Sequence, residues 1–152
     1  MNALDLMKDD HDKMKQLFDD ALADKNPDAR ATLLHQIRSA LIAHERMEED
    51  VFYPALRSAG REAKEIVLEG YEEHHIIDVI LDELLEVPEE AEHWQAKLKV
   101  LKENLEHHID EEEGEMFKRA RQLLGKQTLE ELGRQMHSVK TAQISNSTTT
   151  GP

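Results

Sequence analysis

Four long segments of this chain carry apolar residues at alternating steps of three and four, the spacing that places side chains along one face of an α-helix. None of these segments shows the period-two alternation of a β-strand. Residues that end or begin helices separate the segments at 24–28, 58–60 and 87–90. Helices joined by such short loops pack antiparallel to their neighbours. We therefore predict an all-α fold, an up-down antiparallel four-helix bundle.

A fourth break, at 124–126, precedes a shorter amphipathic segment. The apolar residues of this segment recur at helical spacing and are Leu129, Leu132, Met136 and Val139. We predict a bundle over residues 1–124 and a short extra C-terminal helix over residues 125–142 that caps it. Residues 143–152 are polar and small and bury too little surface to offset their chain entropy, so we predict a disordered tail there.

The composition fits one helical domain and limits its partners. The 152 residues can bury one continuous core, and only six glycines and four prolines interrupt helix formation. The net charge of −14 argues against nucleic acid or an anionic membrane as a partner, because binding either one depends on Lys and Arg. Cysteine is absent from the sequence, so any metal must be bound by histidines and carboxylates.

The sequence carries no sign of a targeting or membrane segment. Residues 1–12 contain no basic region followed by an apolar run, and a run of about eighteen apolar residues occurs nowhere. We expect neither a signal peptide nor a membrane span, and we expect a cytoplasmic location.

One histidine interrupts each of the four apolar stripes, and two stripes also carry a glutamate. The histidines are His11, His44, His74 and His108, and the glutamates are Glu48 and Glu112. Each glutamate follows a histidine by four residues, which on a helix is about 40° around the axis and roughly 6 Å along it. Both side chains can therefore reach one point beside the helix, a spacing suited to chelating a metal ion.

A single histidine on an inward face is more often an ordinary core residue than a ligand, because buried polar groups usually find a hydrogen-bond partner. Four histidines and two carboxylates in one core would bury several charges, each costing several kcal/mol unless a cation compensates them. A metal is therefore the simpler explanation. The alternative is a metal-free helical interaction module in which these histidines are core residues.

The remaining histidines and the acidic runs are expected at the surface. The histidines that continue no stripe are His35, His75, His93, His107 and His137. The acidic runs at 9–10 and 111–113 are typical of solvated helix faces, and we expect Glu49 and Glu113 to lie on such faces as well.

The order of these residues resembles that of the hemerythrin-like, or HHE cation-binding, family. The matching residues are His11, His44-x-x-x-Glu48-Glu49 ending in Phe52-Tyr53-Pro54, Glu73-His74, and His108-x-x-x-Glu112-Glu113. The resemblance spans about residues 5–120 and implies a four-helix bundle that binds two iron ions. By this resemblance the four histidines supply nitrogen ligands, while Glu48 and Glu112 bridge the metals. Imidazole and carboxylate donors suit iron, with manganese or zinc as substitutes.

The sequence departs from the oxygen-carrying hemerythrins on the third helix. Those proteins place a second histidine four residues from the first, whereas here positions 70 and 78 hold Gly70 and Asp78. One nitrogen donor is missing, which disfavours reversible oxygen storage. Asp78 is a candidate for a ligand, for a hydrogen-bond acceptor behind a ligand, or for a charge at the edge of the stripe. Tyr71 is a candidate for a phenolate ligand, for a neighbour of the site, or for a core aromatic residue.

The sequence leaves three functions to be tested. The first is a di-iron protein that binds or senses dioxygen, nitric oxide or peroxide, or that handles iron. The second is an enzyme that breaks down peroxide or nitric oxide at the same centre, and the third is the metal-free module. No residue is assigned a catalytic role, and no protein partner is identified.

Overall fold

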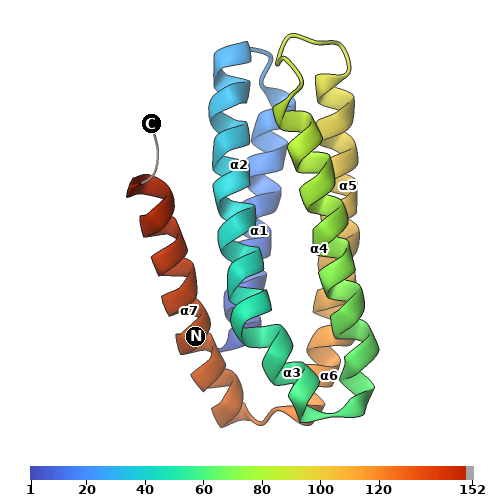
Figure 1. The fold of residues 1–152 in the computed structure, drawn as a ribbon, viewed down its shortest axis with the longest axis vertical. Helices are drawn as coiled ribbons and strands as arrows, with labels where there is room; N and C mark the ends of the chain where they lie inside the picture. Colours follow the sequence, from blue (N-terminus) through green and yellow to red (C-terminus); the bar gives the residue numbers. More distant parts are fainter. Residues whose placement is uncertain (150–152) are drawn as a thin grey trace.

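Four long helical rods run up and down side by side in the computed structural model, which describes residues 1–149 and the side chains of residues 1–146 (Figure 1). The first rod is α1 (Ala3–Ala23) and the third is α4 (Lys64–Leu85), preceded by the short turn η2 (Arg61–Ala63). The second rod joins α2 (Pro27–Met47), η1 (Glu48–Phe52) and α3 (Tyr53–Ala59). The fourth joins α5 (Trp94–Glu111), η3 (Glu112–Met116) and α6 (Phe117–Leu123). The predicted all-α bundle is confirmed.

The helices end and begin at the predicted breaks for local reasons. Asn26 caps α2, because its side chain accepts the backbone N–H groups of Asp28 and Ala29, while Pro27 occupies the first turn, where its missing N–H costs nothing. Asn2 caps α1 by accepting the N–H of Asp5. The first break therefore encodes the start of α2 as well as the end of α1.

A buried arginine ties the loops together at the end of the bundle where α1 meets α2. The Arg30 guanidinium donates to the backbone oxygens of Asp24 and Glu89 and to the side chain of Gln95, and it lies 4.8 Å from the centre of the Trp94 ring. These contacts join the loop after α1 to the long loop before α5 and satisfy a charge that would be costly to bury unpaired.

Two π-helical turns interrupt the second and fourth rods, each beginning at the glutamate of a His-x-x-x-Glu motif. The Tyr53 N–H bonds to the Glu48 oxygen, and the Phe117 N–H bonds to the Glu112 oxygen, five residues back in both cases. Such a turn accommodates one extra residue and changes the direction in which the following side chains point. The matching positions of the two turns extend the similarity between the second and fourth rods.

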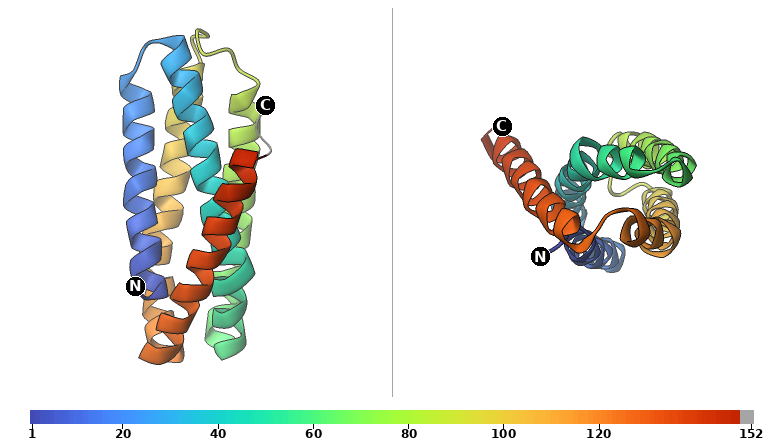
Figure 2. Two further views of the ribbon diagram at one scale, coloured as in Figure 1. Left: turned by 90° about the vertical axis from the view of Figure 1, so that its left-hand side faces the viewer. Right: turned by 90° about the horizontal axis from the view of Figure 1, so that it is seen from below.

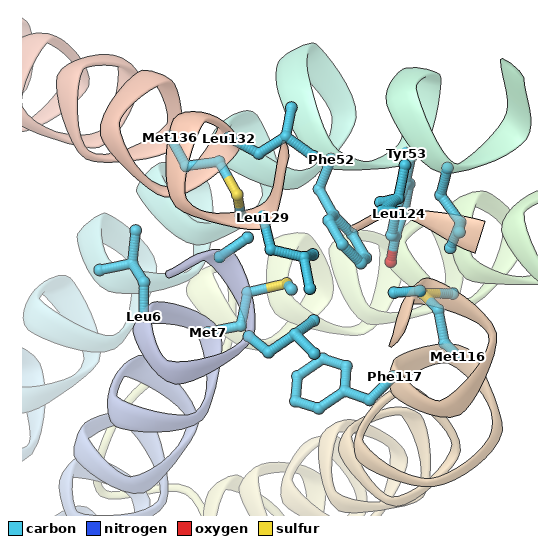
Figure 3. Close-up of a cluster of buried hydrophobic side chains, with 14 of the residues drawn as sticks. Leu6, Met7, Phe52, Tyr53, Met116, Phe117, Leu124, Leu129, Leu132 and Met136 are labelled. Atoms are coloured by element: carbon cyan, nitrogen blue, oxygen red, sulfur yellow. The ribbon is translucent and has the colours of Figure 1, made fainter. Parts of the chain in front are cut away.

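The core consists of two apolar clusters. The α7-side cluster includes Leu4, Met7, Met47, Phe52, Leu56, Met116, Phe117, Leu129, Leu132 and Met136. Figure 3 shows how the π turns, α1 and the C-terminal helix meet in it. The loop-side cluster includes Met14, Phe18, Ile37, Leu41, Ile77, Leu84, Trp94, Leu98 and Leu101. The four stripe histidines lie between the two clusters on every rod, as His11 does between Met7 and Met14.

The C-terminal helix α7 (Lys126–Thr149) is longer and differently placed than predicted. It crosses the outside of α1 and α2 instead of capping the end of the bundle (Figure 2). Helix also replaces the disorder predicted for residues 143–149, whereas residues 150–152 of the predicted tail lie outside the described residues. The physical reason is that Leu132 and Met136 pack into the α7-side cluster, and Ile144 lines a groove along α2, so the helix has a surface to follow.

The first residues of the chain pass very close to α7. A Cβ atom at Gly133 would overlap the Met1 backbone oxygen, so only glycine fits at this crossing.

Among the described residues, no helix has both the length and the apolar character needed to cross a membrane.

Candidate metal centre

The six residues predicted as ligands come together in one buried layer between the apolar clusters. We call them the His–Glu cluster, and their exposed fractions are 0% for His11, 2% for His44, 0% for Glu48, 3% for His74, 2% for His108 and 1% for Glu112. Each of the four rods contributes one histidine, and the π turns contribute the glutamates. The structure thus places every predicted ligand at the same level of the bundle.

The first half of the cluster contains the histidines of α1 and α2. Nε2 of His11 lies 2.9 Å from Oε1 of Glu112, and Nε2 of His44 lies 3.0 Å from Oε2 of Glu48. One donor atom from each of these four residues falls within 4.8 Å of the other three, close enough to hold one metal ion.

The second half contains the histidines of α4 and α5. Nε2 of His74 lies 2.9 Å from Oε1 of Glu48, and Nε2 of His108 lies 3.3 Å from Oε2 of Glu112. Both glutamates therefore turn one oxygen toward each half. Each carboxylate could therefore supply a donor atom to a cation held beside either histidine pair.

The outer nitrogen of every histidine in the cluster donates to a carboxylate on a neighbouring rod. The pairs from Nδ1 are His11 with Glu113 at 2.6 Å, His44 with Asp10 at 3.0 Å, His74 with Glu49 at 2.8 Å and His108 with Glu73 at 2.7 Å. Together they form a closed ring around the bundle, which we call the carboxylate ring. It fixes the protonated nitrogen on the outside of each imidazole and turns every Nε2 inward.

The prediction that Asp10, Glu49 and Glu113 lie on solvated helix faces is wrong. Asp10 is only 5% exposed, and the side chains of Glu49 and Glu113 are 35% and 25% exposed. The available signal was adjacency, since each of these acids stands next to a member of the cluster in the sequence. A step of one residue turns a side chain about 100° around a helix, which here directs it to the neighbouring rod.

The five histidines predicted at the surface are all exposed.

Tyr53 is the residue of the site that the sequence analysis missed. Its hydroxyl is fully buried, donates to Oε2 of Glu112 at 2.8 Å, and lies 3.3 Å from Nε2 of His74. It is 3.5 Å from Nε2 of His108, so the phenol belongs to the second half of the cluster. The Phe-Tyr pair after the first His-x-x-x-Glu motif was the signal, and the π turn that begins at Glu48 explains why its second member points inward.

The two further candidates lie outside this shell. Tyr71 packs edge-on against the ring of Tyr53, with 5.1 Å between the ring centres, and is only half-buried. Asp78 pairs with the Glu45 carboxyl in a surface groove. Neither is among the residues whose donor atoms converge in the His–Glu cluster.

Gly70 makes room for the Tyr53 phenol. A Cβ atom at position 70 would lie 2.8 Å from the Tyr53 hydroxyl oxygen and 2.9 Å from the ring carbon that carries it. A side chain at position 70 and the inward phenol therefore exclude each other.

Without a metal, protons must balance the buried carboxylates. Burial and the Glu112 carboxylate oppose ionisation of Glu48, but the histidines, led by His44, outweigh them and lower the pKa of Glu48 from 4.5 to about 2. Burial also opposes protonation of His74, yet hydrogen bonds to Glu48 and Glu49 raise its pKa from 6.5 to about 9. The cluster thus holds positive charge wherever its carboxylates are ionised, a charge that metal ions can supply instead.

His108 follows the same pattern as His74, while the Tyr53 phenol stays neutral. Burial disfavours the charged form of His108, but the Glu112 carboxylate dominates and raises the pKa of His108 well above 6.5. Burial and the negative charges of Glu112 and Glu48 raise the pKa of Tyr53 well above 10. Tyr53 therefore keeps its proton at neutral pH in the metal-free cluster and acts as a hydrogen-bond donor.

Two buried atoms in the first half are placed to bind a ligand. Nε2 of His44 and Oε2 of Glu48 have no hydrogen-bond partner among the described residues, although they lie 3.0 Å apart. Buried polar atoms without a partner are costly, and this pair faces one common point. Imidazole nitrogen and carboxylate oxygen are donors that iron, manganese and zinc accept, so the residues present fit a metal ion.

Comparison with known proteins supports this assignment. The hemerythrin HHE cation-binding domain matches residues 2–120. An uncharacterised protein of Mycobacterium tuberculosis is 32% identical over 118 residues, which cover 77% of this chain and 71% of that protein. A DNA nickase of Nostoc sp. is 26% identical over 140 residues, which cover 92% of this chain and 39% of the nickase.

A solved structure shares the complete arrangement of helices. The crystal structure of a hemerythrin HHE cation-binding domain-containing protein from Mycobacterium kansasii superimposes with a TM-score of 0.88 at 28% identity. The superposition covers 98% of this chain and 91% of that one. With the family match over most of its length and the buried His–Glu cluster in place, this chain belongs to the hemerythrin HHE cation-binding domain family.

Proposed function

We propose that this chain is a non-haem di-iron protein that binds or senses dioxygen, nitric oxide or peroxide. The observation that carries the proposal is the geometry of Glu48 and Glu112, each of which offers one oxygen to each pair of histidines. One buried layer thereby contains two adjacent donor sets that share both carboxylates. Handling of iron itself is the other role that this geometry serves.

The donor count leaves room for a small molecule. The first half brings together two imidazole nitrogens and two carboxylate oxygens, and the second brings together two imidazole nitrogens and one carboxylate oxygen, fewer than the six positions that iron commonly fills. When bound, the iron pair would supply a two-electron couple and open coordination positions. The chain itself fixes the imidazoles through the carboxylate ring, and the two apolar clusters on either side keep bulk water out of the layer.

The competing readings are less well supported. A metal-free interaction module would keep Nε2 of His44 and Oε2 of Glu48 buried, 3.0 Å apart, without a hydrogen bond of normal geometry. The similarity to the nickase covers 39% of that protein, and a net charge of −14 is unfavourable for a nucleic-acid partner. We therefore propose small molecules as the partners, and the cytoplasmic location stays a prediction.

The proposal is tested by the iron content of single variants. Replacing a bridging carboxylate, in Glu48→Ala or Glu112→Ala, removes one donor from each half, so iron content should fall by more than half in either variant. His35→Ala is the matched control, because His35 is exposed and lies off the apolar stripe of α2. Equal iron content in all three variants would contradict the proposed ligands.

Breakdown of peroxide is a second candidate function, and Tyr53 is the observation that favours it. Its hydroxyl is a buried, neutral donor beside both histidines of the second half, where it can hold or deliver a proton to a bound oxygen atom. Tyr53→Phe should lower turnover of hydrogen peroxide by about tenfold or more while iron content is retained. Tyr71→Phe is the control, and turnover absent from the unmodified protein would exclude this function.

A further inference from the structure

An acidic groove between α2 and α4 approaches the second half of the His–Glu cluster from outside. The groove has a volume of about 360 Å³, and its acidic side chains are Glu45, Glu49, Asp50, Asp78 and Asp82. Arg38 and Arg46 also line it, so its carboxylates outnumber its cations. We call it the α2–α4 groove.

The floor of the groove lies one imidazole away from the His–Glu cluster. Glu49 lines the groove and accepts the Nδ1 proton of His74 at 2.8 Å, while Nε2 of the same ring faces Glu48. Donor atoms of Glu45, Glu49 and His74 lie within 4.8 Å of one another, close enough to hold one cation. This second donor set is distinct from the cluster but shares His74 with it.

Glu45 indicates a ligand independently of the charge in the groove. The residue is 9% exposed, and its Oε1 atom is buried with no hydrogen-bond partner among the described residues. Its carboxyl otherwise pairs with Asp78 across the groove. A buried carboxyl oxygen without a partner is costly, and a cation in the groove would supply the contact that this atom lacks.

The spacing on α2 connects the groove to the cluster. Glu45 precedes Glu48 by three residues and Glu49 by four, so the three side chains are neighbours on the helix surface. A cation held by Glu45 and Glu49 would therefore lie beside Glu48. It could pass from one carboxylate to the next without returning to solvent.

Two other grooves lack this combination. The acidic groove between α4 and α5 is lined by Glu69, Glu72, Glu73 and Glu111, none of which is buried. The groove between α1 and α7 is lined by Lys13, Arg134 and Lys140, whose charges disfavour a cation.

We propose that Glu45, Glu49 and Asp78 form a transit site that admits a divalent cation, ferrous iron, from solvent to the His–Glu cluster. The inference rests on the proposed di-iron function and adds the route by which the metal enters. It assigns Glu45 and Asp78 a role in the rate of metal uptake, and it leaves the final metal content to the cluster itself.

The test compares the rate of uptake with the final content of iron. Metal-free protein is mixed anaerobically with ferrous iron, and the free iron that remains is measured over time with a colorimetric chelator. Glu45→Gln and Asp78→Asn should each take up iron about tenfold more slowly than the unmodified chain and reach the same final content. Glu111→Gln is the matched control, because Glu111 adjoins the ligand Glu112 as Glu45 adjoins His44 but lines the other acidic groove.

A second measurement detects the transit site directly. Iron-loaded protein titrated with Mn²⁺ and followed by electron paramagnetic resonance should show one additional weak site, which Asp78→Asn removes. Asp78 is partly exposed, so this variant carries the test even if Glu45→Gln does not fold.

The outcomes separate the two proposals. If the unmodified chain takes up no iron, the di-iron function itself fails. If it loads but Asp78→Asn matches its rate, or Glu111→Gln slows uptake equally, the transit site alone is overturned. Unchanged initial rates with a lower final iron content in Asp78→Asn would also overturn it, because they would mark a structural role.

Discussion

Each histidine of the His–Glu cluster takes its orientation from an acid on another rod. The carboxylate ring joins α1 to α2, η1 to α4, α4 to α5, and η3 back to α1. At the scale of the residue, the geometry of the site therefore depends on these four hydrogen bonds as well as on the six residues of the His–Glu cluster. A histidine freed from its acid could rotate or change tautomer and would bind metal less well.

Loss of one acid of the ring should weaken metal binding without removing a ligand. Glu113→Ala removes the acceptor that lies 2.6 Å from Nδ1 of His11, so we expect the affinity for iron to fall by about ten- to a hundredfold. Competition with a chelator measures this loss. Glu115→Ala is the control on the same π turn, because Glu115 is exposed, and an equal loss in that variant would contradict the role of the ring.

Gly70 should tolerate no side chain while the Tyr53 phenol points inward. In Gly70→Ala the new methyl group would lie 2.8 Å from the Tyr53 hydroxyl, so we expect a loss of about 1–3 kcal/mol in the free energy of unfolding. Gly114→Ala is the control, because a Cβ atom there meets nothing within 4 Å. Urea unfolding measures both variants, and equal stabilities would place Tyr53 elsewhere.

At the scale of the element, α7 is connected to the His–Glu cluster through charge. Lys140 on α7 forms an ion pair with Asp10, which in turn accepts from His44, so a helix outside the bundle reaches the first half of the site in two steps. Burial opposes ionisation of Asp10, but His44 and Lys140 outweigh it and lower the pKa of Asp10 below 3.8. The π turns act on the site from within the bundle, because they set the positions of Glu48 and Glu112 and of Tyr53, which follows the first turn.

Removal of the Lys140 charge should affect one of the two metal positions. Lys140→Ala leaves Asp10 buried without its cation, and we expect one iron to be released to a chelator several-fold faster while the other is unaffected. Lys13→Ala is the control, since Lys13 is exposed and pairs with Asp9. Uniform release of both irons in Lys140→Ala would show that α7 acts on the bundle as a whole.

The elements also show how far the sequence could be read. The period of the apolar stripes predicted the four rods and the histidines that interrupt them, and the His-x-x-x-Glu spacing added Glu48 and Glu112, because both patterns depend on regular helix geometry. The π turn after Glu48 breaks that geometry, and no residue type marks it, so Tyr53 was missed. The length of α7 was missed because Ile144 lines a groove along α2, a tertiary contact that composition does not reveal.

At the scale of the whole molecule, the bundle holds a charged layer between two apolar clusters, so its stability depends on what balances that charge. Without metal, the balance comes from protonated histidines beside ionised glutamates. If metal ions bind, neutral histidines and the same glutamates would surround them. The two forms should therefore respond to pH in opposite directions.

The metal-free protein should lose stability as the pH rises from about 6.5 to 9. The pKa of His74 is raised from 6.5 to about 9, so its contribution is complete below 6.5 and is lost as the pH rises through 9. The pKa of Glu48 is lowered from 4.5 to about 2, so its contribution is complete above 4.5 and is lost as the pH falls through 2. Metal-loaded protein should instead gain stability as the pH rises through 6.5. Below that pH, protons bind the histidines of the unfolded chain and favour unfolding. Urea unfolding of both forms at pH 6, 7.5 and 9 decides the matter, and parallel curves would contradict this charge balance.

The central claim is that the His–Glu cluster holds two irons, and the metal content of the unmodified protein tests it most directly. Protein purified aerobically after growth with added iron should contain about two irons per chain and absorb in the near ultraviolet, as a ferric pair with nitrogen and oxygen ligands does. A content of less than about half an iron per chain, with no such absorption, would contradict the account.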